Sequence, residues 1–253
     1  MTRESVSPAA FTDWLTALEV RHLANLRFPE VTRALRALSS AYVERRHKVS
    51  DGATLDSSGK RAAFALFYGP LHFLTLSHIV AAAGVRVPSS VLDLGCGTGA
   101  AASAWATSSA TRARVFGIDR HPWAVEEARW TYRFFALDGT ARVGDVSRLP
   151  PLERHGGIIA AYLMNELPDA VRLKVEEQML TAARLGTAVL VIEPIARTIT
   201  PWWNASADRF IAAGGRADEW RFPVTPPEAL LRFGRAAGLR HTELTARTLM
   251  VNT

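Results

Sequence analysis

The glycine-rich segment at residues 91–99, VLDLGCGTG, constrains the fold of this chain more than any other feature. An apolar run leads into Gly95, Gly97 and Gly99, and an alanine-rich stretch of helical character follows. Glycines allow a tight turn and a close approach of the backbone to a ligand. The start of the next helix offers free N–H groups to an anionic group. Because dinucleotide-binding folds use G-x-G-x-x-G and this loop reads G-x-G-x-G, we expect a nucleotide-like ligand without a pyrophosphate.

Acidic residues follow the next two predicted strands. Asp119 ends the run 114–119, where a carboxylate can accept hydrogen bonds from both hydroxyls of a ribose. It can also cap the helix that begins near Pro122, and the two roles are compatible. After the short run 141–143, we expect Asp145 to accept a hydrogen bond from an adenine amino group and Val146 to pack on the ring; an ordinary loop aspartate is the alternative. Three motifs in this order predict one ligand site at the carboxyl edge of an open sheet.

The order of the predicted elements is that of an α/β protein. Residues 1–85 read as helical, with an exposed polar loop at 48–60 and a long apolar helix at 61–83 that bends at Gly69-Pro70. From residue 86, apolar runs alternate with helical patterns, which predicts a mostly parallel sheet covered on both faces. The strands expected are 91–94, 114–119, 141–143, 157–163, 188–193, 239–246 and 248–252. The helices expected in this part are 98–108, 122–136, 169–183, 197–213 and 226–237.

Together the segments VLDLGCGTG, GID and GDV resemble the cofactor motifs of class I methyltransferases, over residues 89–253. The resemblance implies a Rossmann-like sheet of seven strands, the last antiparallel, with S-adenosylmethionine (SAM) as cofactor. We therefore expect a helical cap or lid at residues 1–85 and a SAM-binding domain at residues 86–253. The resemblance places Asp93 near the methionine amine, Gly95, Gly97 and Gly99 along SAM, Asp119 at the ribose and Asp145 at adenine.

We add three neighbours to the expected cofactor-binding residues: Cys96, Arg120 and Val146. Cys96 lies inside the glycine loop, and a thiol at a helix N-terminus can have a lowered pKa. Other small residues would fit the same position, so we interpret Cys96 as a loop residue and not as a nucleophile.

A narrower resemblance extends over most of the chain. The segments SDG at 50–52, RAAF at 61–64, YGPL at 68–71, AYLMNELP at 161–168 and VIEP at 191–194 resemble the Rsm22-type family, which is linked to the small ribosomal subunit. Many members of that family carry a cysteine cluster after the fifth strand that holds a metal centre. This chain has one cysteine, Cys96, so it departs from the family there, and the expected ribosomal connection is weaker.

The candidate catalytic residues are Asn165 and Glu166, which follow the fourth predicted strand. Methyl transfer from a sulfonium requires mainly that the acceptor be held in line and, where needed, lose a proton. Asn165 could accept a hydrogen bond from a target amine, and Glu166 could orient or deprotonate a hydroxyl. The alternative is that Glu166 only caps or pairs near the helix that begins at Asp169.

Composition limits the other classes of function. A single cysteine among 253 residues excludes an internal disulfide and a cysteine-based metal site, and we expect no metal. The N-terminus lacks a signal pattern, and the apolar stretch 64–85 reads as a buried helix, so we expect a cytoplasmic protein without a membrane partner.

Three hypotheses about function stay open. The formal net charge of +6, with 27 arginines and 3 lysines, is compatible with a nucleic-acid partner, although it can also reflect genome composition. The leading hypothesis is a SAM-dependent methyltransferase that acts on RNA, in particular ribosomal RNA or a ribosomal particle. The second is a small-molecule methyltransferase whose helical N-terminal third forms a lid. The third is a SAM-binding ribosome-assembly factor without turnover.

Overall fold

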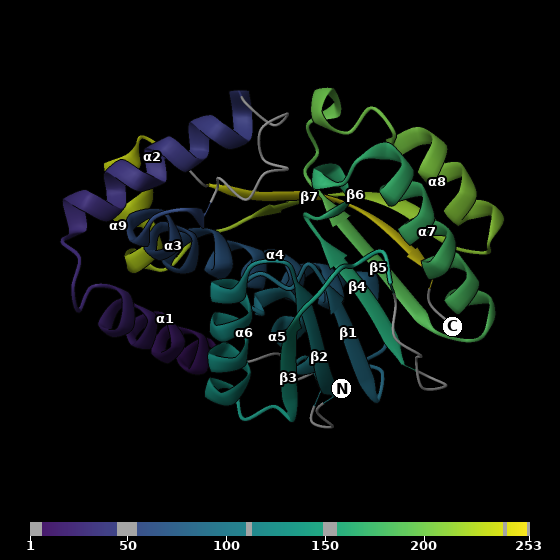
Figure 1. Ribbon diagram of the computed structural model, residues 1–253, viewed down its shortest axis with the longest axis horizontal. Coiled ribbons are helices and arrows are strands. Elements are labelled where there is room, and N and C mark those ends of the chain that lie inside the picture. Colours follow the sequence, from purple (N-terminus) through teal and green to yellow (C-terminus); the bar gives the residue numbers. More distant parts are fainter. Residues whose placement is uncertain (1–6, 45–54, 110–112, 149–155, 240–241, 252–253) are drawn as a thin grey trace.

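The computed structural model describes residues 7–44, 55–109, 113–148, 156–239 and 242–251. Its centre is a seven-stranded sheet in the order β3-β2-β1-β4-β5-β7-β6 (Figure 1). Strands β1 to β5 are parallel to one another, whereas β7 is antiparallel to both β5 and β6. The strands are β1 Ser90–Leu94, β2 Arg114–Asp119, β3 Gly139–Val143, β4 Gly157–Ala161, β5 Ala188–Glu193, β6 Arg216–Pro223 and β7 Glu243–Val251. The predicted Rossmann-like α/β fold is confirmed.

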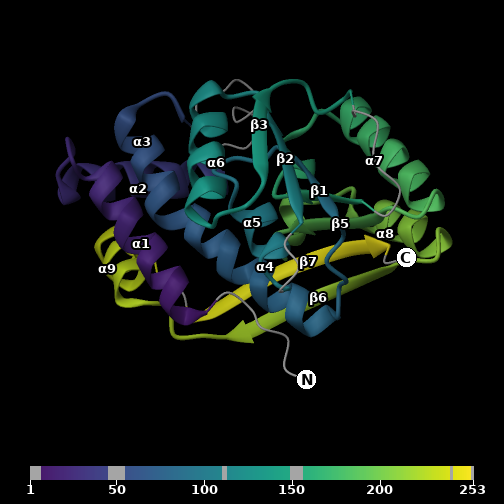
Figure 2. The ribbon, with the colours of Figure 1, turned by 90° about the horizontal axis from the view of Figure 1, so that it is seen from below.

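Helices cover the sheet on both faces (Figures 1 and 2). The helices α4, α5 and α6 form the layer on one face, with α1 packed outside them, and α7 and α8 cover the other face. The longer helices are α1 Pro8–His22, α2 Phe28–Glu44, α4 Gly69–Ala83, α6 Pro122–Phe134, α7 Asp169–Arg184, α8 Trp203–Ala212 and α9 Glu228–Ala237. The shorter ones are α3 Ser58–Ala63 and α5 Ala100–Ala106.

The N-terminal helices belong to the same hydrophobic core as the sheet. Trp14 of α1 packs against Phe73 of α4 and Phe135 at the end of α6, with ring centroids 5.3 Å apart in both pairs. Leu35 of α2 and Leu76 of α4 are buried in the same cluster as strand residues such as Val115. A second cluster, between the sheet and α7 and α8, fills the opposite face. The N-terminal region is therefore fixed against the sheet by a shared core.

The helical segment Ser58–Ala83 is long and apolar enough to cross a membrane by composition, and 67% of its most apolar window is buried inside the protein. Within it the predicted bend takes an unexpected form. Residues Phe64–Tyr68 form a π-helix, η3, directly before Gly69 and Pro70. Such a wide turn is frequent at functional sites. Of the predicted loop at 48–60, residues 48–54 lie outside the described residues, and α3 already begins at Ser58.

The predicted end of the chain is wrong in three respects. Residues 216–223, for which no helix or strand was predicted, form the edge strand β6. The two strands expected at 239–246 and 248–252 are one strand, β7, because Arg247 continues the ladder opposite Glu193. Its guanidinium is accommodated by the Trp203 ring and the Ile195 carbonyl. The helix expected at 197–213 is a 3₁₀ turn, η5 Arg197–Ile199, followed by α8.

Candidate active site

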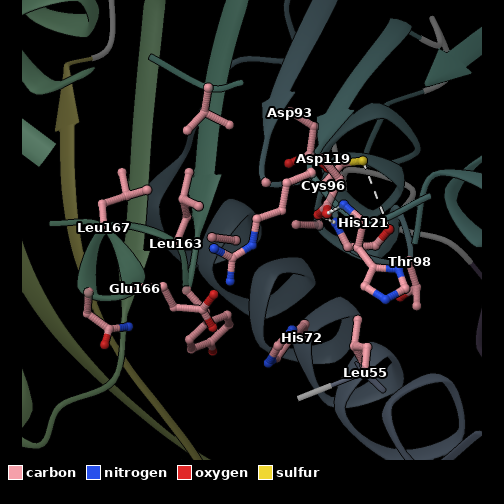
Figure 3. A pocket seen from close by; sticks show the side chains of 18 of the residues that line it. Leu55, His72, Asp93, Cys96, Thr98, Asp119, His121, Leu163, Glu166 and Leu167 are labelled. Carbon is pink, nitrogen blue, oxygen red and sulfur yellow. Dashed lines mark hydrogen bonds between the residues drawn. The ribbon is translucent and has the colours of Figure 1, made fainter. Parts of the chain in front are cut away.

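A cavity of about 650 Å³ lies at the carboxyl ends of the parallel strands. It is centred on β1 and β4, where the strand order reverses and where open α/β sheets bind ligands. The π-helix and α4 of the N-terminal region close it from the other side. Figure 3 places Asp93, Asp119 and His121 on one side of the cavity and Glu166 on the other, with His72 of α4 between them.

All but one of the predicted site residues line this cavity. The lining includes Asp93, Gly95, Cys96, Gly97, Asp119, Arg120, Asp145, Val146, Asn165 and Glu166. Gly99 does not line it: this residue is the N-cap of α5, and an added Cβ would meet the Tyr132 ring at 2.7 Å and the Ala128 backbone at 3.0 Å. Because Gly99 has no side chain, α5 and α6 can approach each other closely.

The glycine loop adopts a backbone that only glycine accepts readily. Gly95, Gly97 and Gly99 have φ angles of 63°, 51° and 75°. An added Cβ at Gly95 would lie 2.6 Å from Leu163, whereas at Gly97 the nearest atom is a ring carbon of Phe64 at 3.6 Å. The loop therefore presents backbone, with no side chain, to the cavity at both positions.

Asp119 ties the glycine loop to the second strand. Its carboxylate accepts a hydrogen bond from the Gly97 N–H at 2.9 Å and another from the His121 N–H at 2.8 Å. His121 in turn caps α6, because its Nδ1 accepts from the Trp123 N–H. Each carboxylate oxygen retains acceptor capacity for a ribose hydroxyl, since a carboxylate has about four acceptor sites.

Asp93 is a buried carboxylate with an unsatisfied oxygen. Its Oδ2 accepts from the Ala102 N–H at 3.3 Å, whereas Oδ1 has no partner and the residue is 1% exposed. Burial raises the pKa of Asp93 to about 8. The negative charge of Asp119 adds to this rise, whereas the hydrogen bond from Ala102 opposes it. A cationic ligand group at Oδ1 would satisfy this oxygen and stabilise its charge. The ammonium of a bound methionine moiety has the required chemistry.

Asp145 has the opposite environment. It is exposed, and hydrogen bonds from the Ser147 N–H and hydroxyl lower its pKa. Val146 next to it is 9% exposed and belongs to the second core cluster. A charged acceptor beside an apolar side chain suits the amino group and the face of an adenine ring.

Arg120 and Cys96 differ in character. Arg120 is exposed, and its guanidinium contributes a positive charge to the lining of the cavity. The Cys96 thiol is buried, and this burial, with the nearby Asp93 and Asp119, raises its pKa well above the ordinary value. A thiol held in its protonated form agrees with its interpretation as a loop residue. In the part of the chain that the structure describes, no cluster of three or more histidine, cysteine or acidic side chains could hold a metal.

Asn165 and Glu166 lie in a 3₁₀ turn, η4 Met164–Glu166, after β4. The Asn165 side chain donates to Glu193 Oε2 at 2.6 Å, and its backbone N–H approaches Glu193 Oε1 at 3.3 Å. Glu193, at the end of β5, is completely buried. Because a carboxylate only accepts, this contact fixes the Asn165 amide with its NH₂ toward Glu193. Glu193 therefore positions Asn165.

An aromatic wall, formed by Phe64, Tyr68, His72 and Tyr162, lines the cavity beyond the glycine loop. The His72 and Tyr162 rings are stacked, with centroids 4.0 Å apart and planes inclined by 21°. Tyr68 is hydrogen-bonded to Ser39 of α2, so that helix also supports the wall. The sequence did not predict this grouping, because η3, α4 and β4 meet only in the folded chain.

Tyr162 carries a strained backbone. Its φ of 58° is rare for a residue with a side chain, and such conformations gather at functional sites. Its N–H donates to the Ile192 carbonyl at 2.8 Å, and its hydroxyl is hydrogen-bonded to Thr75 of α4. These contacts hold the ring across the end of β4, under His72.

Comparisons with known proteins show what the chain is similar to. Residues 91–186 match a family described as a methyltransferase domain. A methyltransferase solved with the Trm112 methyltransferase activator of Haloferax volcanii is 20% identical, with a TM-score of 0.52, covering 80% of this chain and 96% of that one. The mitomycin 7-O-methyltransferase MmcR is 12% identical, with a TM-score of 0.52, covering 94% and 72%.

The magnesium protoporphyrin IX methyltransferase of Synechocystis PCC 6803, solved with bound SAH, is 15% identical, with a TM-score of 0.48 and coverages of 86% and 98%. No curated protein matches the chain. The family match spans β1 to the end of α7, which includes all three cofactor motifs. The chain thus contains a class I methyltransferase domain and is a SAM-dependent methyltransferase.

Proposed function

We propose that this enzyme transfers the methyl group of SAM to a small molecule held over β4 and β5, beneath the π-helix and α4. The observation that carries the proposal is the aromatic wall, together with the apolar side chains Leu55 and Pro194 that line the same cavity. Pockets for small molecules are concave and mostly apolar, with a few placed polar groups.

The order of the strands divides the cavity into two halves. Asp93 on β1 suits the methionine amine, Asp119 on β2 the ribose, and Asp145 after β3 the adenine, so SAM would extend from β1 toward β3. On the other side of β1 come β4 and β5, where Tyr162 and Asn165 line the remaining space. We call this space the acceptor half.

SAM supplies an electrophilic methyl group on a sulfonium that leaves as a neutral thioether. The residues of this chain hold the acceptor in line with that methyl group and manage its proton. Asn165, fixed by Glu193, orients the acceptor atom. The carboxylate of Glu166 accepts the proton that the acceptor releases, which is the role of a general base.

The charges of the cavity favour this proposal over an RNA acceptor. Four carboxyl groups line it, on Asp93, Asp119, Asp145 and Glu166, against the single guanidinium of Arg120 among the described residues. A phosphate backbone is bound by clustered positive charge, which this lining does not offer. In the described ranges, nine arginines form ion pairs within the protein: Arg21, Arg114, Arg129, Arg172, Arg209, Arg216, Arg221, Arg232 and Arg235.

RNA is the second candidate acceptor, because of the net charge of +6. The Rsm22-type resemblance, with the ribosomal acceptor or assembly role that it implies, stays a prediction, and its segment at 50–52 lies outside the described residues. A cytoplasmic location and the absence of a membrane partner also stay predictions.

Label transfer distinguishes the candidates. The protein is incubated with methyl-labelled SAM and either a cell extract freed of macromolecules by filtration or purified ribosomal RNA and ribosomal particles. We expect label in the small-molecule filtrate, and none after Glu166→Gln. Label in RNA alone would refute the proposal in favour of the RNA enzyme. SAM binding without transfer to any pool would favour the assembly factor.

A further inference from the structure

We infer that the methyl acceptor is an uncharged planar molecule with a hydroxyl or N–H group, and that His72 is the residue that orients it by a hydrogen bond. The inference deepens the proposed function and rests on it for the identity of the acceptor half. It assigns a role to a histidine that the sequence did not connect with the site.

His72 faces the cavity from α4, and Figure 3 shows it between the cofactor residues Asp119 and His121 and the acceptor-half residue Glu166. In the described part of the chain, neither ring nitrogen of His72 has a hydrogen-bond partner within the protein. The side chain is half-buried, and its nitrogens are not among the buried side-chain atoms that lack a partner, so they are open to the cavity. The imidazole is therefore suited to bind a polar group of the acceptor.

The ring is held in place on several sides. Its face stacks on Tyr162 at 4.0 Å between centroids, and Phe64 meets it edge-on at 6.1 Å with planes at 83°. Tyr162 is hydrogen-bonded to Thr75, which lies one turn after His72 on the same helix. The strained backbone of Tyr162 thus supports a ring that fixes the direction of the imidazole.

The chemistry of the acceptor half determines what this imidazole can bind. Desolvation lowers the pKa of His72 to about 3, so the ring is neutral and offers one donor and one acceptor nitrogen. Among the described lining residues of this half, Glu166 is the charged one, so an anionic acceptor would meet repulsion and no counter-ion. The stacked rings of the aromatic wall favour a flat ligand.

The reaction then balances without a further reactant. The acceptor oxygen or nitrogen forms a bond to the methyl carbon while the carbon–sulfur bond breaks, and that bond's electron pair stays on sulfur. The acceptor's O–H or N–H bond breaks, its electrons stay on the acceptor atom, and the proton passes to Glu166. His72 directs the lone pair of the acceptor atom toward the methyl carbon and itself gains no proton.

The test uses the full chain saturated with SAH, with phenol as the probe and toluene as the matched probe without a hydroxyl. His72→Phe keeps a ring on Tyr162 and removes both nitrogens. His78→Phe is the control, since His78 also lies on α4 and stacks on an aromatic ring, that of Phe222 at 5.1 Å, but does not line the cavity. His72→Gln, which keeps a donor and an acceptor, is the rescue variant.

Nuclear magnetic resonance of ring-labelled histidine follows the binding. We expect phenol to shift the His72 resonance and toluene to leave it unchanged. His72→Phe should weaken phenol binding about tenfold, and His72→Gln should recover part of this affinity. His78→Phe should bind phenol as the wild type does. The SAH-induced rise in melting temperature should be the same in all variants. An unmoved resonance, or equal phenol binding in the wild type and His72→Phe, overturns the inference.

Two further outcomes separate this inference from the proposed function. If phenol contacts His72 but no small molecule in the filtrate accepts label, the proposed function fails and the binding role of His72 stands. If label enters a small molecule with the same kcat/KM in His72→Phe as in the wild type, the proposed function stands and the role of His72 is refuted.

Discussion

Replacing Asp93 by Asn should stabilise the ligand-free protein and abolish SAM binding. The carboxylate is buried, its Oδ1 has no partner, and its pKa is raised from 3.8 to about 8. Because the folded state holds the proton more tightly than the unfolded state, stability falls as the pH rises from about 4 to about 8. Asn keeps the oxygen that accepts from the Ala102 N–H, and it has no charge to bury.

The size of the effect follows from the pKa gap. One pKa unit is worth about 1.4 kcal/mol, and pH 7 lies about three units above the ordinary value of 3.8, so the upper limit is about 4 kcal/mol. The Asn NH₂ is also buried and needs a partner, so we expect a gain of about 2 kcal/mol. Urea unfolding at pH 5 and pH 8 measures it, and the gain should be larger at pH 8.

Asp145→Asn is the matched control, because the pKa of Asp145 is lowered by its hydrogen bonds to Ser147 and the residue is exposed. That variant should gain no stability. Calorimetry with SAH completes the test: binding should be lost in Asp93→Asn, and in the wild type it should strengthen between pH 6 and pH 8 as Asp93 ionises. Asp93→Asn could instead be less stable than the wild type at pH 8, or bind SAH with the same affinity. Either result would show that Asp93 Oδ1 is not an unsatisfied oxygen that waits for the ligand's ammonium.

Three other substitutions test separate contacts. Asp119→Ala removes the acceptor of the Gly97 and His121 N–H groups, and we expect SAH affinity to fall at least tenfold in calorimetry, given about 1.5–3 kcal/mol for a hydrogen bond to a charged group; an unchanged affinity contradicts the ribose assignment. Glu127→Gln should lower the free energy of unfolding by about 2 kcal/mol in urea at pH 7, because it breaks the ion pair between the buried Glu127 carboxylate and the exposed Arg21 guanidinium. Burial alone would raise the pKa of Glu127, but its bonds to His22 and Arg21 lower it, so the wild type's advantage should be present above pH 4.5 and should shrink as the pH falls below that value; an advantage that does not shrink in acid contradicts this. Gly95→Ala should lower the melting temperature and weaken SAH binding, because a φ of 63° costs a non-glycine residue about 1 kcal/mol and the new Cβ displaces Leu163; a variant indistinguishable from the wild type would show that the loop tolerates a side chain.

The sequence was most informative where local chemistry decides the structure. The glycine loop, the strand-terminal Asp119 and the helix begun by Pro122 were predictable, because positive φ angles, a terminal acid and an N-terminal proline are local requirements. The cofactor side of the cavity follows from them, since the carboxyl ends of parallel strands meet at one edge.

The rest depends on contacts between distant segments. Strand β6 escaped prediction because its residues alternate between exposed and half-buried positions, and its apolar pattern is interrupted by charge. Two strands were predicted on either side of Arg247, yet the Trp203 ring and the Ile195 carbonyl, distant in sequence, accommodate this residue inside one strand, β7. The stacking of His72 on Tyr162 likewise joins α4 to the end of β4. A pattern in the local sequence cannot predict a contact between residues so far apart in the chain.

A crystal structure of the protein with SAH tests most directly the central claim, that the cofactor occupies the β1-to-β3 side and leaves the β4 and β5 side for the acceptor. We predict the SAH ammonium about 3 Å from Asp93 Oδ1, the ribose hydroxyls on Asp119, and the sulfur facing Tyr162 and Asn165. Adenosine lying against Tyr162 and His72, with the space beside Asp145 empty, would contradict the account.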